Sequence, residues 1–174
     1  MSLAIYTIGH STRSADAFLG LLAAHSIGAV ADVRTIPKSR RHPHFSREAM
    51  EEWLGRSGIA YRHFPALGGL RRPKTDSINT AIRHPSFRGY ADHMQTPEFV
   101  DGVAALETFA AERLTTVMCA EALWWQCHRR LLADALFVRN VKVQHILSSA
   151  PAKPHELSAF AQVHGSRVTY PGLV

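Results

Sequence analysis

The sequence predicts an α/β fold, with a mostly parallel sheet flanked by helices on both faces. Short apolar runs typical of buried strands alternate with stretches whose apolar residues recur at helical spacing. A chain of 174 residues with 46% hydrophobic residues can bury one good core. We therefore expect a single domain over residues 1–174, made of a core at 1–147 and a C-terminal extension at 148–174.

The first half of the chain begins with an apolar strand at residues 3–8. A helix follows, with a core stripe of Phe18, Leu19, Leu22 and Ala23, and Ser11, Thr12 and Ser14 can each cap it. A second strand is expected at 27–33. It is followed by a helix that is capped by Ser46 and ends at Ser57-Gly58, and then by a short strand at 61–64. Residues 67–69 read as a turn that brings the backbone close to another segment. The polar and basic residues 71–83 are expected to form a mobile lid or a binding loop.

The second half is predicted to contain helices at 87–94 and 96–112, and a buried strand at 114–118. A helix is expected to begin at Gln126, and a strand spans 142–147. Asn140 precedes this strand and suits a helix that ends in a left-handed residue. Residues 148–153 read as a linker, 154–163 as a short helix and 167–170 as a last β-prone segment.

Composition narrows the class of protein. No apolar run reaches 18 residues, so no membrane span is expected. The first apolar run is broken by residues 6–10, which leaves no signal-peptide pattern. Two cysteines are too few for a disulfide framework, so we expect a cytoplasmic protein with reduced thiols.

Positive charge is concentrated in one block. Residues 34–88 contain twelve Lys and Arg against four Asp and Glu, a net +8, whereas the rest of the chain carries −2. Such a block favours an anionic partner, either nucleic acid or a phosphorylated small molecule. A solvated basic surface explains the same charge.

Polar residues follow three of the predicted strands, as Gly9-His10-Ser11, Asp32-Val33-Arg34 and Cys119-Ala120-Glu121. Because the carboxyl ends of parallel strands meet at one edge of a sheet, we expect these segments to share one crevice. An Asp in a buried strand is costly unless it is paired. Arg34 projects from the same side as Asp32, so the two form either an internal ion pair or a polar pair beside a ligand.

Both cysteines lie where the fourth strand gives way to a helix. Cys127 is near the predicted helix start with His128 and Arg129 beside it, and these surroundings favour a thiolate. Cys119 ends a buried strand and is also explained as a small core residue. Glu121 suits a general base, a ligand-orienting group or a helix cap.

Metal binding is a further possibility for this cluster. Cys119, Cys127, His128 and His10 are residue types that bind zinc, but their spacing differs from that of usual zinc sites. We therefore expect no metal and no cofactor.

Several motifs together resemble the DUF488 family. They are Thr7-Ile8-Gly9-His10-Ser11, Asp32-Val33-Arg34 with Pro37 and Ser39-Arg40, Leu67-Gly68-Gly69, Phe87 with Tyr90, and Cys119-x-Glu121-x5-Cys127-His128-Arg129. The resemblance runs from about Ile5 to Ile146 and implies a cytoplasmic, mostly bacterial and archaeal α/β protein whose activity is not established. The chain departs from the family pattern at Leu123-Trp124-Trp125, where a proline is expected in the middle.

These observations favour an enzyme that acts on a nucleotide-like or otherwise phosphorylated anionic substrate in the crevice. The expected catalytic residues are Cys127, Glu121, His128 and Cys119, and the expected substrate-binding residues are His10, Ser11, Asp32, Arg34, Arg40 and Arg129. Two alternatives stay open. One is a nucleic-acid-binding module that uses the basic region 34–88, and the other is a thiol or redox protein that uses Cys119 and Cys127.

Overall fold

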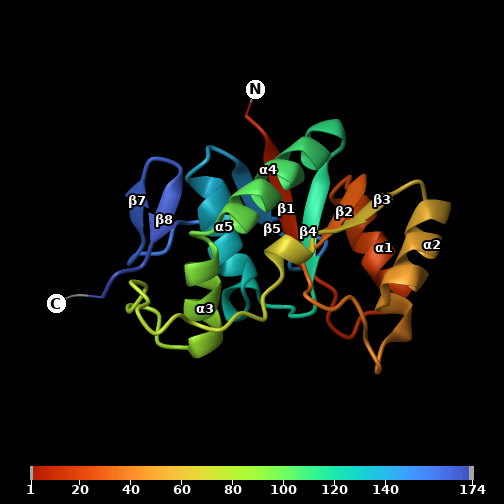
Figure 1. Cartoon of the computed structure of the whole chain (residues 1–174). Coiled ribbons are helices and arrows are strands. Elements are labelled where there is room, and N and C mark those ends of the chain that lie inside the picture. Colours follow the sequence, from red (N-terminus) through yellow and green to blue (C-terminus); the bar gives the residue numbers. More distant parts are fainter. Residues whose placement is uncertain (1, 173–174) are drawn as a thin grey trace.

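A six-stranded sheet forms the centre of the protein, with strand order β3-β2-β4-β1-β5-β6 (Figure 1). The computed structural model describes residues 2–172. The strands are β1 (Ala4–Gly9), β2 (Ala29–Asp32), β3 (Ala60–His63), β4 (Thr115–Cys119), β5 (Lys142–His145) and β6 (Lys153–Pro154). The first five are parallel to one another, and only β6 pairs antiparallel, with β5. The predicted α/β fold with a mostly parallel sheet is confirmed.

Helices cover both faces of this sheet (Figure 1). The helices are α1 (Ala15–Ala24), α2 (Arg47–Arg56), α3 (Pro85–His93), α4 (Pro97–Glu112) and α5 (Arg129–Phe137). On one face, Phe18 of α1 and Leu54 of α2 pack in a cluster with Met118 of β4. On the other face, α3, α4 and α5 pack in a larger cluster that includes Val117 and Cys119. Each buried strand thus alternates its side chains between two cores.

Local signals account for the ends of several helices. Of the three residues proposed to cap α1, Ser14 does so by accepting a hydrogen bond from the Ala17 N–H. Ser46 caps α2 in the same way, as the sequence predicts, and Thr96 caps α4. Asn140, after α5, has the expected left-handed backbone, with φ of 63°.

The predicted helix at 154–163 is wrong. Lys153–Pro154 form β6, and β7 (Gln162–His164) pairs with β8 (Arg167–Thr169) in a hairpin whose Gly165 has φ of 65°. Between β6 and β7, the side chains of His155 and Ser158 hydrogen-bond Asp134 of α5. These tertiary contacts, together with the hairpin, override a local composition that favours a helix. The β-prone segment near 167–170 is confirmed in part as β8.

The helix predicted to begin at Gln126 begins later, at Arg129. Trp124–Gln126 form a separate 3-10 turn, and Cys127 is extended, with φ of −143°. The Cys127 sulfur accepts a hydrogen bond from the Arg129 N–H, so the thiol occupies the start of α5.

Residues 71–83 have no regular structure, but they are anchored. The Asp92 carboxylate of α3 accepts hydrogen bonds from the Lys74 N–H, the Ser77 hydroxyl and the Asn79 amide. Asn79 is fully buried. The segment is therefore held against α3 along part of its length.

Candidate active site

The three predicted strand ends lie side by side. Gly9 is the register partner of Cys119, and Asp32 is the partner of Met118. Since β4 is hydrogen-bonded to both β1 and β2, the polar residues that follow these strands meet at one edge of the sheet.

The segment after β1 is fastened to the segment after β4. The His10 N–H donates to the Cys119 carbonyl over 2.8 Å, and the Ser11 N–H donates to the Ala120 carbonyl over 3.0 Å. A Cβ atom at Gly9 would overlap the Glu121 carbonyl oxygen. The absence of a side chain at Gly9 therefore lets the Cys119–Glu121 segment lie directly against β1.

The two thiols are adjacent and share one cation. The Cys119 and Cys127 sulfur atoms are 3.3 Å apart. The Arg129 Nε–H lies 3.0 Å from the Cys119 sulfur and 3.3 Å from the Cys127 sulfur. Cys127 Sγ also accepts from the Arg129 backbone N–H at the start of α5, over 3.3 Å.

These contacts shift the pKa values of the two thiols in opposite directions. The hydrogen bond from Cys119 lowers the pKa of Cys127 most; burial opposes this, and the Arg129 charge and N–H groups lower the pKa further, from 9.0 to about 6. Burial and the hydrogen bond to Cys127 raise the pKa of Cys119 well above its usual value. Near neutral pH, Cys127 is therefore a thiolate that accepts a hydrogen bond from a protonated Cys119.

Arg129, one of the predicted substrate-binding residues, is buried and uses its N–H groups within the protein. Its side chain is 1% exposed. Nη2 donates to the Glu121 carbonyl over 2.5 Å and Nη1 donates to the Thr7 hydroxyl over 3.1 Å. The guanidinium is a fixed internal cation below the sulfur atoms.

A pocket of about 450 Å³ lies in front of the thiols. Of the predicted site residues, Arg34, Cys119, Glu121, Cys127 and His128 line it. Sequence reasoning did not assign a role in the site to the further lining residues Thr35, Ile36, Lys38, Gly69, Leu70, His84, Ser86, Phe87, Ala120 and Gln126. Gly69 and Phe87 belong to the motifs and Lys38 is one of the cations of the basic block, whereas Ile36 and Leu70 in loops and Ser86 in the first turn of α3 carry no recognisable signal.

Arg34 forms the buried side of this pocket and is 6% exposed. Its Nε and Nη2 donate to the two Asp32 oxygens over 2.9 and 2.6 Å, so the expected pair is present. Tyr61 donates its hydroxyl to Asp32 over 2.5 Å. Burial alone would lower the pKa of Arg34, but the hydrogen bonds and charge of Asp32 raise it.

His10 is neutral and faces Arg34. Its Nδ1 is 2.9 Å from the Ser11 carbonyl, which can only accept, so Nδ1 carries the proton. Nε2 is then free to accept from Arg34 Nη1, 3.4 Å away. Burial lowers the pKa of His10 to about 4, and the Arg34 charge contributes to this shift.

His128 is also neutral and is tied to the backbone. Its Nε2–H donates to the Val33 carbonyl over 2.9 Å, and burial lowers its pKa to about 4. A Cβ atom at Gly69 would lie 2.5 Å from His128 Nδ1, so the turn at Gly69 leaves room for the imidazole. With one ring nitrogen used in this way, His128 joins two loops and has no contact with either sulfur among the described hydrogen bonds.

The remaining predicted site residues differ in position. Glu121 is exposed and lines the pocket, with Oε1 accepting from the Leu123 N–H over 3.3 Å. Ser11 is half-buried with φ of 50°, and Arg40 is exposed; neither lines the pocket. Within the basic block, Arg71 donates to the Gly68 and Pro65 carbonyls, which occupies part of its guanidinium.

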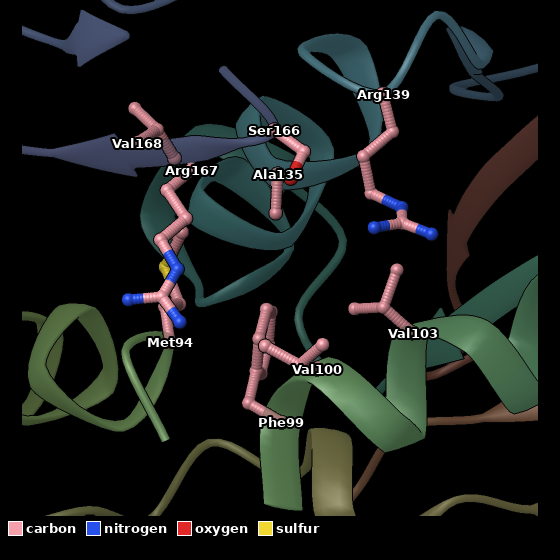
Figure 2. A pocket seen from close by; sticks show the side chains of 9 residues that line it. All are labelled: Met94, Phe99, Val100, Val103, Ala135, Arg139, Ser166, Arg167 and Val168. Atoms are coloured by element: carbon pink, nitrogen blue, oxygen red, sulfur yellow. The ribbon is translucent and has the colours of Figure 1, made fainter. Parts of the chain in front are cut away.

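A second cavity, of about 180 Å³, lies between α4, α5 and β8 (Figure 2). Its lining is largely apolar, with Met94, Phe99 and Val103 among the labelled side chains. Arg139 at its edge is paired with Glu107. No cysteine or histidine lines this cavity.

A family model described as "Domain of unknown function DUF488" matches residues 14–136. No curated protein and no solved structure matches the chain. No helix within residues 2–172 is long and apolar enough to cross a membrane. In the same part of the chain, no three His, Cys, Asp or Glu side chains are grouped so that they could hold a metal ion.

Proposed function

This chain belongs to the DUF488 family, and we propose that it is a thiol-dependent enzyme whose nucleophile is Cys127 and whose substrate is a small anionic molecule. The observation that carries the proposal is the arrangement of Cys127, which lies on the pocket wall and accepts hydrogen bonds from Cys119 and Arg129. A thiolate stabilised in this way near neutral pH is the form that reacts with electrophiles.

Charged groups around the pocket support an anionic substrate. Arg34 and Lys38 line it from the loop after β2, His84 lines it from the position before α3, and Glu121 is the acidic residue in the lining. Phe87, Ile36 and Leu70 add apolar surface suited to a ring or another apolar part of the molecule. This combination fits a nucleotide-like or sugar-phosphate compound, the substrate class that the basic block favours.

In the proposed reaction, the Cys127 sulfur gives an electron pair to an electrophilic atom of the substrate and forms a bond to it. The bond to the leaving group breaks, and the leaving group departs with its electron pair. Water then attacks the adduct, Glu121 accepts the water proton, and the Cys127 thiolate is released. His128 positions the loop around the pocket and takes no proton in this scheme.

The experiment is a screen of nucleotides and sugar phosphates with the wild-type enzyme, in which products are identified by mass spectrometry. Cys127→Ser should abolish turnover, and Glu121→Gln should slow release of the adduct so that a modified Cys127 accumulates. Arg56→Ala is the matched control because its ion pair with Glu52 is exposed on α2, away from the pocket. Equal turnover by wild type and Cys127→Ser would contradict the proposal.

A second candidate function is thiol–disulfide exchange, and the 3.3 Å separation of the sulfur atoms favours it. Here Cys127 attacks a substrate disulfide and releases one substrate thiolate. Cys119 then loses its proton and attacks Cys127, which releases the second thiolate and leaves a Cys119–Cys127 disulfide. Two electrons pass from the dithiol to the substrate, which requires the reduced thiols expected of the cytoplasm.

Cys119→Ser separates these two functions. The serine hydroxyl can still donate a hydrogen bond to the Cys127 thiolate, but it cannot form a disulfide. Turnover of an anionic substrate should persist in Cys119→Ser, whereas reduction of a small disulfide should stop after formation of the mixed disulfide. Catalytic disulfide reduction that persists without Cys119 would contradict the exchange mechanism.

A further inference from the structure

A chain of hydrogen bonds begins at Arg129, below the thiols, and crosses the protein interior to Asp134. Thr7 Oγ1 accepts from Arg129 Nη1 over 3.1 Å and lies 2.6 Å from His145 Nδ1. His145 Nε2 is 2.9 Å from His155 Nδ1. His155 Nε2 is 2.7 Å from Asp134 Oδ1. We call these five residues the Arg129–Asp134 chain.

A neutral His155 gives the protons of this chain one direction. The Asp134 carboxylate only accepts, so His155 Nε2 carries the proton and, in the neutral ring, Nδ1 accepts from His145 Nε2–H. His145 Nδ1 is then an acceptor, and the Thr7 hydroxyl must donate to it. The Thr7 oxygen can then accept a hydrogen bond from Arg129 Nη1–H. This hydrogen bond helps to fix the position of the guanidinium.

Solvent has almost no access to the chain. The exposed fraction of its five side chains is 5% or less. The ring of Trp124 stacks on His145, with the two centroids 4.0 Å apart and the planes at 4°.

A network whose only role was to hold the C-terminal segment to α5 would need fewer residues. Asp134 already accepts from the Ser158 hydroxyl and from the Tyr170 hydroxyl, and both hold the C-terminal segment to α5. Two histidines and a threonine extend the network to the cation at the thiols, and a buried polar network of this length is costly unless every member is satisfied. Thr7, His145 and His155 all lie outside residues 14–136, the part of the chain that matches the family model.

We propose that Thr7, His145, His155 and Asp134 are positioning residues for the thiol site, and that the C-terminal segment contributes to the site through His155. The Arg129–Asp134 chain holds the guanidinium against the two sulfur atoms, so that the negative charge on Cys127 keeps its cation. This inference rests on the proposed thiolate chemistry of Cys127.

The groups that face Cys127 limit what else can set its charge. Cys119 comes from β4, Arg129 from α5, and the buried Tyr90 from α3. Burial raises the pKa of Tyr90 well above its usual value, so its hydroxyl stays neutral. Burial, and after it the neighbouring His155 and Arg129, lower the pKa of His145 to about 3, so His145 stays neutral as well. Arg129 is thus the cation that contacts the Cys127 sulfur, and its charge and N–H groups add to the effect of the Cys119 hydrogen bond on the pKa of Cys127.

The test is site-specific labelling of Cys127 by iodoacetamide as a function of pH, read by mass spectrometry on the full chain. His155→Phe keeps the ring volume but removes the acceptor for His145, and the labelling midpoint should move to higher pH. If the labelling midpoint of the variant rises by one pH unit, its labelling rate at pH 6 falls by about five-fold. His155→Gln, whose amide can accept and donate, should restore most of the wild-type rate.

Two further variants keep the result interpretable. Ser158→Ala removes a donor to Asp134 but leaves the Arg129–Asp134 chain intact, so its midpoint should equal that of wild type even if the variant is less stable. Thr7→Val should raise the midpoint and Thr7→Ser should restore it, which tests the link to Arg129 if His155→Phe does not fold.

A folded His155→Phe or Thr7→Val variant with the wild-type midpoint overturns the proposal. These outcomes are distinct from failure of the thiolate function itself. In that case the wild-type protein would already label with the midpoint of an ordinary thiol, before any comparison of variants.

Discussion

At the scale of single residues, the site depends on one buried cation. The Arg129 Nε lies within hydrogen-bond distance of both sulfur atoms. The other N–H groups of its guanidinium donate to the Thr7 hydroxyl and to the Glu121 and Ala122 carbonyls. A planar guanidinium with five N–H donors can satisfy all of these acceptors at once, which a lysine cannot do. The charge is therefore held in one place beside Cys127.

Replacement of Arg129 by methionine should remove this charge at similar volume. The pKa of Cys127 should rise toward 9.0, since the Arg129 charge and N–H groups help to lower it. The Thr7 hydroxyl and two carbonyls would lose a donor as well, so we expect a loss of roughly 3–5 kcal/mol in the free energy of unfolding. Absorbance at 240 nm as a function of pH reports the thiolate, and urea titration reports stability.

Arg129→Lys is the companion variant because it keeps the positive charge but loses the planar arrangement of five N–H donors. Its thiolate midpoint should fall between those of wild type and Arg129→Met. If Arg129→Met retains the wild-type midpoint, the guanidinium has no part in holding the thiolate.

The Asp32–Arg34 pair gives a second residue-scale prediction. Asp32 is fully buried, so Asp32→Asn leaves Arg34 without its counter-charge in the interior. We expect a loss of about 3–5 kcal/mol in the free energy of unfolding. Glu51→Gln is the matched control, since the Arg47–Glu51 pair is exposed and should contribute less than about 1 kcal/mol. Similar urea midpoints for the two variants would contradict this account.

Sequence reasoning reached the pairing of Asp32 with Arg34 because their spacing alone puts both on one side of a strand. Substrate binding by Arg129 stays a prediction, because the same residue type serves both as a phosphate clamp and as an internal cation. Only burial separates these two roles, and burial depends on how Thr7 and the Glu121 backbone pack around α5. The partnership of His145 with His155 and Asp134 likewise depends on tertiary structure and leaves no spacing signal.

At the scale of elements, the site depends on the close approach of β1 to the segment after β4. In Gly9→Ala, the new Cβ would overlap the Glu121 carbonyl oxygen, which also accepts from Arg129. We expect displacement of this segment, a loss of roughly 1–3 kcal/mol from overpacking, and altered labelling of Cys127.

Gly20→Ala is the control for this variant. Gly20 lies within α1, and a Cβ atom added there would have no neighbouring atom within 4 Å. Alanine there should stabilise the protein by roughly 0.5–1 kcal/mol and leave Cys127 labelling unchanged. Calorimetric melting of both variants shows whether Gly9→Ala is less stable and Gly20→Ala more stable than wild type. A Gly9→Ala protein with wild-type stability and wild-type labelling would show that the close approach of β1 to the segment after β4 is dispensable.

The elements themselves were largely predictable, because the apolar runs of the strands and the capping residues Ser14, Ser46 and Thr96 are local signals. The parallel direction of the strands followed from their alternation with helices, whereas their order in the sheet did not. The C-terminal segment was not predictable in the same way. Its residues 155–161 have a helix-like composition, but His155 and Ser158 bind Asp134, which is more than twenty positions away in the sequence.

At the scale of the whole molecule, neutral buried histidines link folding to pH. Burial lowers the pKa of His10 and His128 to about 4 and that of His145 to about 3. In the unfolded chain these groups bind protons near pH 6.5, so the unfolded state takes up more protons as pH falls. The free energy of unfolding should therefore decrease from about pH 6.5 down to about pH 4.

Urea titrations at several pH values in this range measure the effect. His25, which is half-buried and hydrogen-bonded to the Ser148 carbonyl, provides a control position in His25→Gln. Replacement of His10 by Gln should flatten the dependence on pH, whereas His25→Gln should leave it close to wild type. Stability that is constant between pH 6.5 and 4 would contradict the assignment of these histidines as neutral.

We infer that folding converts Cys127 into a thiolate at the wall of the pocket. Competitive labelling of the native wild-type protein with isotopically coded iodoacetamide, from pH 4 to pH 10, tests this claim directly. We predict a labelling midpoint near pH 6 for Cys127 and protection of Cys119 over the same range. Labelling of Cys127 only after unfolding, or with a midpoint at or above pH 9, would contradict the account.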